Sequence, residues 1–184
     1  MILPIYLYGQ AVLRKEATEV PADYPDLATL VANMFQTMEK ANGVGLAAPQ
    51  VGLALRMFVV DGNGLAEDYP ECQGVRLCMI NPEIVEASTE TNDKEEGCLS
   101  IPGVYESVKR PNWIVINYLD ENMAEHEERY EGFAARMILH EYDHLDGKMF
   151  VDRVSPLRKT FIKGKLSSII KGKSNPNYKF KGVK

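Results

Sequence analysis

The 184-residue sequence predicts one domain that combines α-helices with short β-strands. Residues 26–41 carry apolar side chains at helical spacing, and residues 132–147 form a second helical stretch that contains a histidine pair. Between them, short runs rich in Val, Ile and Tyr alternate with turn residues, which is typical of strands. The length suits a single domain with a substantial core, so we expect residues 1–184 to fold as one unit.

The composition is that of an ordinary soluble globular protein, with 45% hydrophobic and 26% charged residues. No run approaches the roughly 18 apolar residues of a membrane-spanning helix. The first residues lack the basic start of a signal peptide. Three cysteines without framework spacing favour a reducing compartment, which we take to be the cytoplasm.

The net charge of −5 conceals an uneven distribution. Residues 153–184 hold ten Lys and Arg and no acid, so residues 1–152, with eleven Lys and Arg and all 26 acids, carry a formal charge of −15. Such a basic tail can contact an anionic partner such as RNA, and the alternative is a solvated, charged end. Because the tail contains no motif residue, we expect it to be dispensable for chemistry.

The chain is expected to begin irregularly over residues 2–20, and its first helix to span about residues 26–41. Pro25 stands before this helix and Asn42-Gly43 ends it. One face of the helix would carry the apolar residues Leu27, Leu30, Val31, Met34, Phe35 and Met38.

Residues 43–52 formally match G-x-G-x-x-A, a dinucleotide-binding fingerprint. We reject that interpretation because the fingerprint follows a strand and opens a helix, whereas here a helix precedes it and Pro49 follows. The small residues Ala47 and Ala48 indicate a tightly packed backbone. Gln50 is the only side chain of this segment that can donate a hydrogen bond. In the simplest case it satisfies a local backbone group.

Strands are expected at residues 55–61, 76–81, 83–87, 104–109, 113–119 and 124–130. Pro82 would divide the strand at residues 76–81 from that at residues 83–87. The strands at residues 113–119 and 124–130 would form a hairpin. Residues 62–74 and 88–96 read as polar connections, and residues 97–103 as a turn-rich loop. Ser155-Pro156, an N-cap followed by proline at the first helical position, predicts a last helix to about residue 170.

The second helix contains the pattern H-E-x-x-H at His140, Glu141 and His144. Histidines four residues apart lie on one helix face, so both rings can reach one metal ion, while Glu141 is turned aside to hold a water on that metal. Such a site performs metal-assisted hydrolysis. Phe133 and Met137 continue the same face, which favours a buried site over the alternative of two solvated histidines.

Catalytic metal sites usually combine three protein ligands with one open position, so a third ligand is needed. No His, Glu or Cys follows His144. The candidates that we weigh are Asp146, Asp152, His126, Cys72, Cys78 and Cys98. His126 looks like a solvated strand residue and Cys78 like a core residue. Cys98 lies beside a Pro-Gly turn that could present its thiolate to a metal, with an inert buried thiol as an equal alternative.

Three separated motifs together resemble the peptide deformylases. They are Gly43-Val44-Gly45-Leu46-Ala47-Ala48-Pro49-Gln50, Glu96-Gly97-Cys98-Leu99-Ser100 and His140-Glu141-Tyr142-Asp143-His144-Leu145-Asp146-Gly147. Each motif alone is modest, whereas all three in this order and spacing are highly specific. The resemblance covers nearly the whole chain, including Leu13-Arg14 near its start.

The resemblance implies an α+β fold in which antiparallel β-sheets surround a central metal-binding helix, with a C-terminal helix after it. It implies a hydrolase that removes the N-formyl group from the N-terminal methionine of newly synthesised proteins and releases formate. Family members bind one divalent metal, often Fe²⁺, although Zn²⁺, Ni²⁺ or Co²⁺ can occupy the site. The implied partner is an N-formylmethionyl nascent peptide. The basic tail could contact the ribosome, and no membrane partner is implied.

The resemblance also implies roles for particular residues. Those implied to perform the chemistry are Cys98, His140 and His144 as metal ligands, Glu141 as general base, and Gln50 with the backbone N–H of Leu99 as oxyanion donors. Those implied to bind the peptide are Gly45 through its backbone, and Val44, Phe133 and Met137 as the lining of the methionine pocket. Residues 62–74 belong to no motif, so their role is left open.

Two other functions fit parts of the sequence. An H-E-x-x-H endopeptidase would use Asp152 as its third ligand and would cut unformylated peptides internally. A non-catalytic RNA- or ribosome-binding protein would act through the basic tail and hold a structural metal. An assay of formate release, with and without a chelator, separates these functions from deformylation.

Overall fold

The computed structural model describes residues 1–183. Within them, the helices are α1 (Leu27–Lys40), α2 (Gly132–Leu145) and α3 (Pro156–Ile170). The strands are β1 (Ile5–Tyr6), β2 (Gly45–Ala47), β3 (Met57–Asp61), β4 (Arg76–Ala87), β5 (Thr91–Cys98), β6 (Ile101–Pro111), β7 (Trp113–Leu119), β8 (Glu125–Glu131) and β9 (Phe180–Lys181). No helix in this part of the chain is long and apolar enough to cross a membrane.

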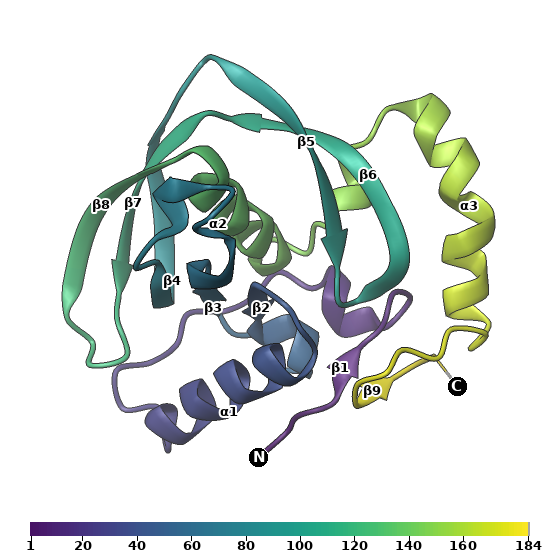
Figure 1. Ribbon diagram of the computed structural model, residues 1–184. Helices are drawn as coiled ribbons and strands as arrows, with labels where there is room; N and C mark the ends of the chain where they lie inside the picture. The colour runs from purple at the N-terminus through teal and green to yellow at the C-terminus, as the bar shows by residue number, and fades with distance from the viewer. Residues whose placement is uncertain (184) are drawn as a thin grey trace.

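The strands form one five-stranded sheet and two pairs. The larger sheet has the order β2-β3-β4-β7-β8 with antiparallel neighbours, β5 and β6 form an antiparallel hairpin, and β1 pairs in parallel with β9. Helix α2 lies in the middle, between the large sheet and the curved hairpin (Figure 1). The predicted α+β fold, with antiparallel sheets around a central helix, is therefore confirmed.

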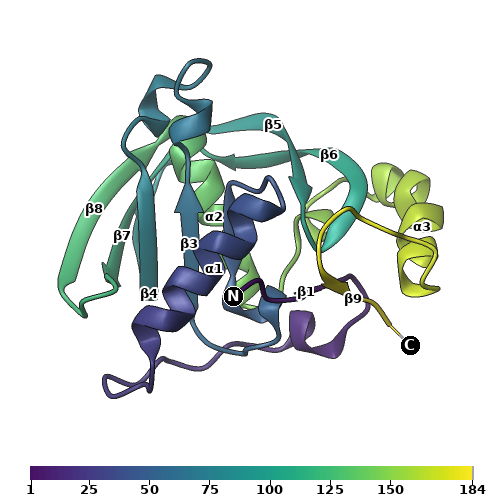
Figure 2. The ribbon, with the colours of Figure 1, turned by 60° about the horizontal axis from the view of Figure 1, so that its bottom comes forward.

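Strand β3 shows how the sheet separates two helices. Its side chains Met57 and Val59 pack into the cluster on α1, and Phe58 and Val60 pack into the cluster on α2. Successive strand residues point to opposite faces, so a strand covered on both faces reads as a continuous apolar run. Helix α1 crosses one face of the sheet in Figure 2, and α2 occupies the other. The sheet thus fixes α2 from one side.

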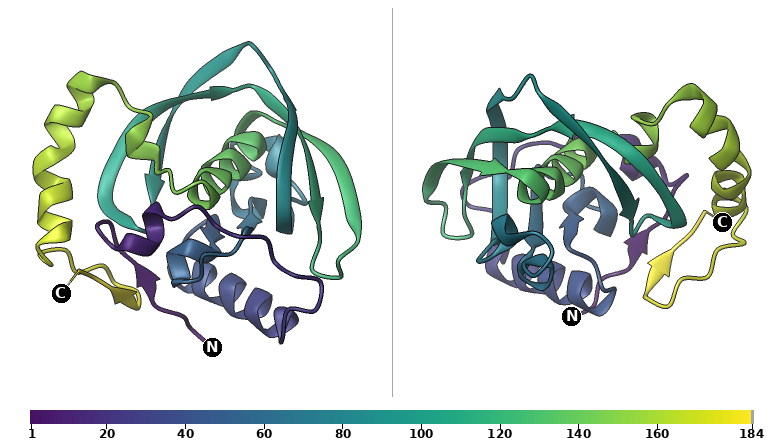
Figure 3. Two further views of the ribbon diagram at one scale, coloured as in Figure 1. Left: turned by 180° about the vertical axis from the view of Figure 1, so that it is seen from behind. Right: turned by 45° about the horizontal axis from the view of Figure 1, so that its top comes forward.

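The helices follow the sequence patterns closely. Helix α1 buries Val31, Met34 and Met38, and its bounds agree with the predicted residues 26–41. Helix α3 begins as predicted, with Ser155 accepting a hydrogen bond from the backbone N–H of Arg158. It lies against the outer side of the β5–β6 hairpin (Figure 3). The hairpin is therefore held between α2 and α3.

Two strand predictions are wrong. Residues 76–87 form one strand rather than two, with a register irregularity between Ile80 and Glu83 that absorbs Pro82. Proline cannot donate to a strand ladder, so it sits where the ladder is already interrupted. Residues 91–98 form strand β5 rather than a polar connection. The side chains of β5 are mostly polar and half of them are exposed, so the apolar alternation of a half-buried strand is missing from its sequence.

The connection at residues 62–74 supports the start of α2. The ring of Tyr69 stacks on Phe133 with 4.3 Å between centroids, and Cys72 is fully buried. The carboxylate of Glu71 accepts a hydrogen bond of 2.8 Å from the backbone N–H of Phe133, in the first turn of α2. A carboxylate there satisfies a donor that lacks a partner within the helix and also complements the helix dipole.

Replacement of Glu71 by alanine should therefore destabilise the fold. Loss of an N-terminal cap typically costs ~1 kcal/mol of unfolding free energy. Replacement of the exposed Glu67 in the same connection is the matched control and should change stability little. Urea unfolding of both variants measures the difference. Equal stability of the two variants would show that Glu71 does not cap the helix.

Candidate functional site

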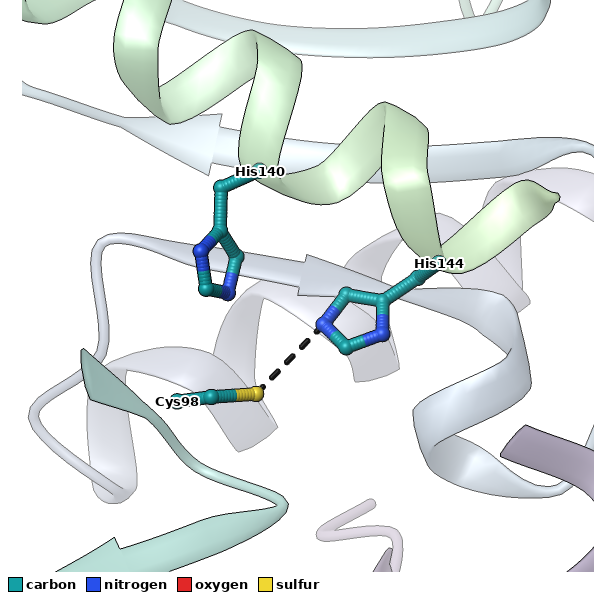
Figure 4. A group of neighbouring side chains, drawn as sticks. All are labelled: Cys98, His140 and His144. Atoms are coloured by element: carbon teal, nitrogen blue, oxygen red, sulfur yellow. Dashed lines mark hydrogen bonds between the residues drawn. The ribbon is translucent and has the colours of Figure 1, made fainter. Parts of the chain in front are cut away.

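Three side chains of the types that ligate metals meet where α2 faces the end of β5. His140 and His144 project from one face of α2 towards Cys98 (Figure 4). The Sγ atom of Cys98 lies 3.4 Å from Nε2 of His144, and one ligand atom from each residue lies within 4.8 Å of the others. Helical spacing places both histidines on one face of α2, and the end of β5 places Cys98 opposite them. Cys98 thus lies next to residues that are more than 40 positions away in the sequence.

The geometry of this cluster fits a divalent metal. Sulfur at ~2.3 Å and nitrogen at ~2.1 Å from one tetrahedral ion lie about 3.5 Å apart, close to the observed contact. His140 directs Nδ1 to the carboxylate of Glu96 at 2.8 Å, which leaves its Nε2 for the cluster. Burial lowers the pKa of His144 to about 3, so this imidazole is neutral, the form that binds metals.

A buried ionic network holds His140 in place. Glu96 accepts two hydrogen bonds of 2.8 Å from Arg110 and one of 2.7 Å from Arg136. Burial by itself would raise the pKa of Glu96, but the hydrogen bonds and charges of Arg110 and His140 together outweigh it and hold the pKa at about 2. Arg110 continues the network to Asp143 at 2.8 Å. The carboxylate therefore stays ionised and can accept the Nδ1 proton of His140.

Sequence reasoning missed this network. The motifs contain Glu96 and Asp143 without indicating a role for either, and Arg110 and Arg136 belong to no motif. A signal existed, because Arg136 and Asp143 interrupt the apolar residues of a predicted buried helix. A buried charge must be paired, but its partner cannot be found from local spacing.

Glu141 lies beside the cluster with its carboxylate almost fully enclosed. Its exposed fraction is 5%, and among residues 1–183 its Oε2 atom has no hydrogen-bond partner. Burial raises the pKa of Glu141 to about 7. The backbone of Gly45 approaches it so closely that an added Cβ would lie 2.8 Å from Cγ of Glu141. Glycine at position 45 is therefore needed to leave room for this carboxylate.

Gln50 has two roles at once. Its Oε1 accepts a hydrogen bond of 2.8 Å from the backbone N–H of Ala47, so it satisfies a local backbone group. Because a backbone N–H can only donate, the amide oxygen of Gln50 must face Ala47. The amide nitrogen of Gln50 therefore points to the opposite side. That nitrogen lies 3.4 Å from Sγ of Cys98 and 3.2 Å from Oγ of Ser100. The Gln50 donor therefore faces the cluster.

One cavity of about 560 Å³ joins these residues. Its lining includes nine of the ten predicted site residues, namely Val44, Gly45, Gln50, Cys98, Leu99, Phe133, Met137, His140 and Glu141. The tenth, His144, contacts Cys98. Phe133 and Met137 lie in this lining with His140, so the apolar stripe of α2 forms one wall of the cavity.

The other candidate ligands lie elsewhere. Asp152 pairs with Arg14 and accepts the backbone N–H of Met149 at 2.8 Å. Asp146 pairs with Arg56 at 3.0 Å, and His126 pairs with Asp120 at 2.9 Å. Cys72 and Cys78 are buried in the core. Because its proposed third ligand is engaged with Arg14, the endopeptidase alternative lacks its ligand set.

Comparisons with known proteins identify the family of the chain. The family model described as polypeptide deformylase matches residues 2–160. The peptide deformylase of Christiangramia forsetii is 49% identical over 188 residues, covering 98% of this chain and 96% of the relative. That of Cytophaga hutchinsonii is 47% identical over 181 residues, covering 98% and 97%.

Solved structures give the same result. The peptide deformylase of Legionella pneumophila aligns with a TM-score of 0.81 at 38% identity, covering 94% of this chain and 98% of that one. The Ehrlichia chaffeensis peptide deformylase, solved with actinonin, aligns at 0.84 with 34% identity, covering 95% and 99%. The chain therefore belongs to the polypeptide deformylase family, metal-dependent hydrolases that remove the N-formyl group from the N-terminal methionine of newly synthesised proteins and release formate.

Proposed function

We propose that Cys98, His140 and His144 hold the catalytic metal of this deformylase and that Glu141 is its general base. The observation that carries the proposal is the convergence of three ligand atoms within 4.8 Å beside a buried carboxylate. A divalent metal in such a site supplies Lewis acidity and makes water nucleophilic near neutral pH. We propose Fe²⁺ as the native metal, with Zn²⁺, Ni²⁺ or Co²⁺ as substitutes, because all suit thiolate and imidazole donors.

The proposed base is Glu141, and its environment suits proton transfer. A pKa of about 7 lets the carboxylate accept a proton from the attacking water and return it to the leaving amine near neutral pH. The backbone of Gly45 lies close to the Glu141 carboxylate, and both residues line the cavity together with His140. One residue can therefore serve both halves of the reaction.

Gln50 and Leu99 are the proposed donors to the oxyanion that develops on the formyl group. The amide nitrogen of Gln50 is already directed to the cluster, and the backbone N–H of Leu99 follows Cys98 directly. Preorganised donors of this kind stabilise the transition state by ~3 to 4 kcal/mol each. A formyl carbon carries only hydrogen, so a narrow site would exclude larger acyl groups.

The proposed peptide-binding surface combines a strand edge with an apolar wall. Strand β2 is the edge of the five-stranded sheet, so the backbone of Gly45 can pair with an extended peptide. Val44, Phe133 and Met137 would receive the methionine side chain. A peptide bound in this way would have its N-formyl group next to Glu141, because the backbone of Gly45 lies close to the side chain of Glu141.

A second proposed partner is the ribosome, which would be contacted by α3. The exposed face of this helix carries Lys159, Lys163 and Lys165 together with the apolar side chains Leu157 and Phe161. Contacts between lysines and phosphates are weakened by salt. Because nascent formylated chains are made in the cytoplasm, we also propose that the protein works there.

Formate release from formyl-Met-Ala-Ser tests the proposed function. The purified protein should release formate, a chelator should stop the release, and Fe²⁺ or Ni²⁺ should restore it. Unformylated Met-Ala-Ser should remain intact. Internal cleavage of longer unformylated peptides would instead support the endopeptidase, and no turnover at all would support a binding protein.

Activity of the Fe²⁺-loaded enzyme should be lost in air far faster than that of the Ni²⁺-loaded enzyme. A thiolate beside a redox-active ion can be oxidised to sulfenic acid and beyond. Cys98 is half-buried at the cavity, so oxidants can reach it. Residual formate release after timed exposure to oxygen measures the difference, with anaerobic samples as controls. Equal inactivation of both forms would exclude metal redox as the cause.

A further inference from the structure

The chain after α3 returns to the body of the molecule. Strand β9 lies beside β1, so segments close to the two ends of the chain pair with each other (Figure 2). Backbone N–H groups of Ile5 and Leu7 donate to the carbonyls of Lys179 and Lys181 at 2.9 and 3.0 Å. Phe180 packs into the cluster between β6 and α3. The backbone of this segment and Phe180 are therefore held against the body of the molecule, while Lys179 and Lys181 stay exposed.

This segment also reaches the cavity of the site. Pro176, Asn177 and Tyr178 belong to the same lining as Cys98 and Glu141. The hydroxyl of Tyr178 donates a hydrogen bond of 2.5 Å to the backbone carbonyl of Leu99. Burial raises the pKa of Tyr178 above its usual value, so the hydroxyl keeps its proton and remains a donor.

Leu99 lies in the two-residue turn between β5 and β6, where the strand ladder ends at the pair Cys98–Ile101. Its carbonyl is thus outside the ladder and is held by Tyr178. The next residue, Ser100, is held through its carbonyl by the backbone N–H of Tyr8 at 2.8 Å and through its hydroxyl by Gln50. Tyr8 follows β1 and Tyr178 precedes β9, so both ends of the chain buttress this turn.

We propose that Tyr178 is a positioning residue for deformylation: by holding the carbonyl of Leu99, it fixes the turn that presents the Leu99 N–H to the reacting oxygen. The inference rests on the proposed role of that N–H as an oxyanion donor. Cys98 is anchored separately by the β5 ladder and by Gln50, so the effect of Tyr178 is on the donor and not on metal retention. The inference also reverses the expectation that the tail is dispensable for chemistry.

The test is the variant Tyr178→Phe, which removes one hydroxyl and keeps the ring. The matched control is Tyr24→Phe, because Tyr24 packs against the same cluster around α1 as Tyr178 does. Both variants are assayed with formyl-Met-Ala-Ser for kcat and KM, and for metal content and thermal stability. A neutral hydrogen bond that acts in the transition state contributes a factor of about three to ten to kcat.

Tyr178→Phe should keep about one metal per chain and a KM near that of the wild type, while its kcat falls about three- to tenfold. Tyr24→Phe should match the wild type in all three. Equal kcat of the two Phe variants, or a loss that appears only in KM or in metal content, would overturn the inference. Absence of formate release by the wild type would instead contradict the proposed function itself.

Discussion

Replacement of Glu141 by alanine should leave a metal-loaded protein that no longer releases formate at a useful rate. The three proposed ligands remain in place, so elemental analysis should still find about one metal per chain. General-base catalysis contributes ~10²- to 10⁴-fold, which sets the minimum expected loss of kcat. The loss should be larger if the same carboxylate also returns the proton to the amine.

Glu141→Gln is the matched variant for this result, because it keeps the volume of the side chain and removes only its basicity. It should be as inactive as Glu141→Ala. The two variants together separate loss of the base from collapse of the enclosed space against Gly45. A metal-loaded variant that retained wild-type turnover would remove Glu141 from the mechanism.

Replacement of Cys98 by alanine should fail differently, through loss of the metal. Removal of groups that merely orient a metal ligand costs ~10- to 100-fold in metal affinity, so removal of a ligand itself should cost at least as much. Formate release should fall with the metal content and recover only in part at high metal concentration. Metal analysis after dialysis, followed by the formate assay, gives both numbers.

Cys78→Ala is the control for this second variant. Cys78 is buried between the large sheet and α1, in a different core cluster from the apolar residues around the histidine pair. Its replacement should lower stability and leave the metal content per folded chain unchanged. Full metal and activity in Cys98→Ala would refute the proposed ligand set and return Asp152 to consideration.

The elements that could be predicted are those with one buried face. Helix α1 and strand β7 agree with their sequence patterns because apolar residues recur at the period of each structure. Local sequence patterns do not predict strand β5, because its exposed side chains are polar. The strand forms through its backbone pairing with β6. Pro82 predicts a break in β4, since local signals do not reveal that β7 pairs with β4 on both sides of this proline.

The residues of the site also divide into those that local patterns predict and those that they do not. The pair His140 and His144 is local and could be read from helical spacing alone. Cys98 could not be separated from an inert thiol by its context, and only the resemblance connected it to the pair. Arg110 and Tyr178 could not be assigned, because their contacts with Glu96 and Leu99 join segments that local patterns do not relate.

Anomalous X-ray diffraction from crystals of the metal-loaded protein tests the central claim most directly. Data collected above and below the absorption edge of the bound metal locate the ion without assumptions about its ligands. The account predicts one strong peak between Cys98 Sγ and the Nε2 atoms of His140 and His144, at ~2.0 to 2.4 Å from each, with Glu141 beside it but not bound. A peak elsewhere, or one ligated by Glu141 or Asp152 in place of Cys98, would contradict the proposed ligand set and the mechanism built on it.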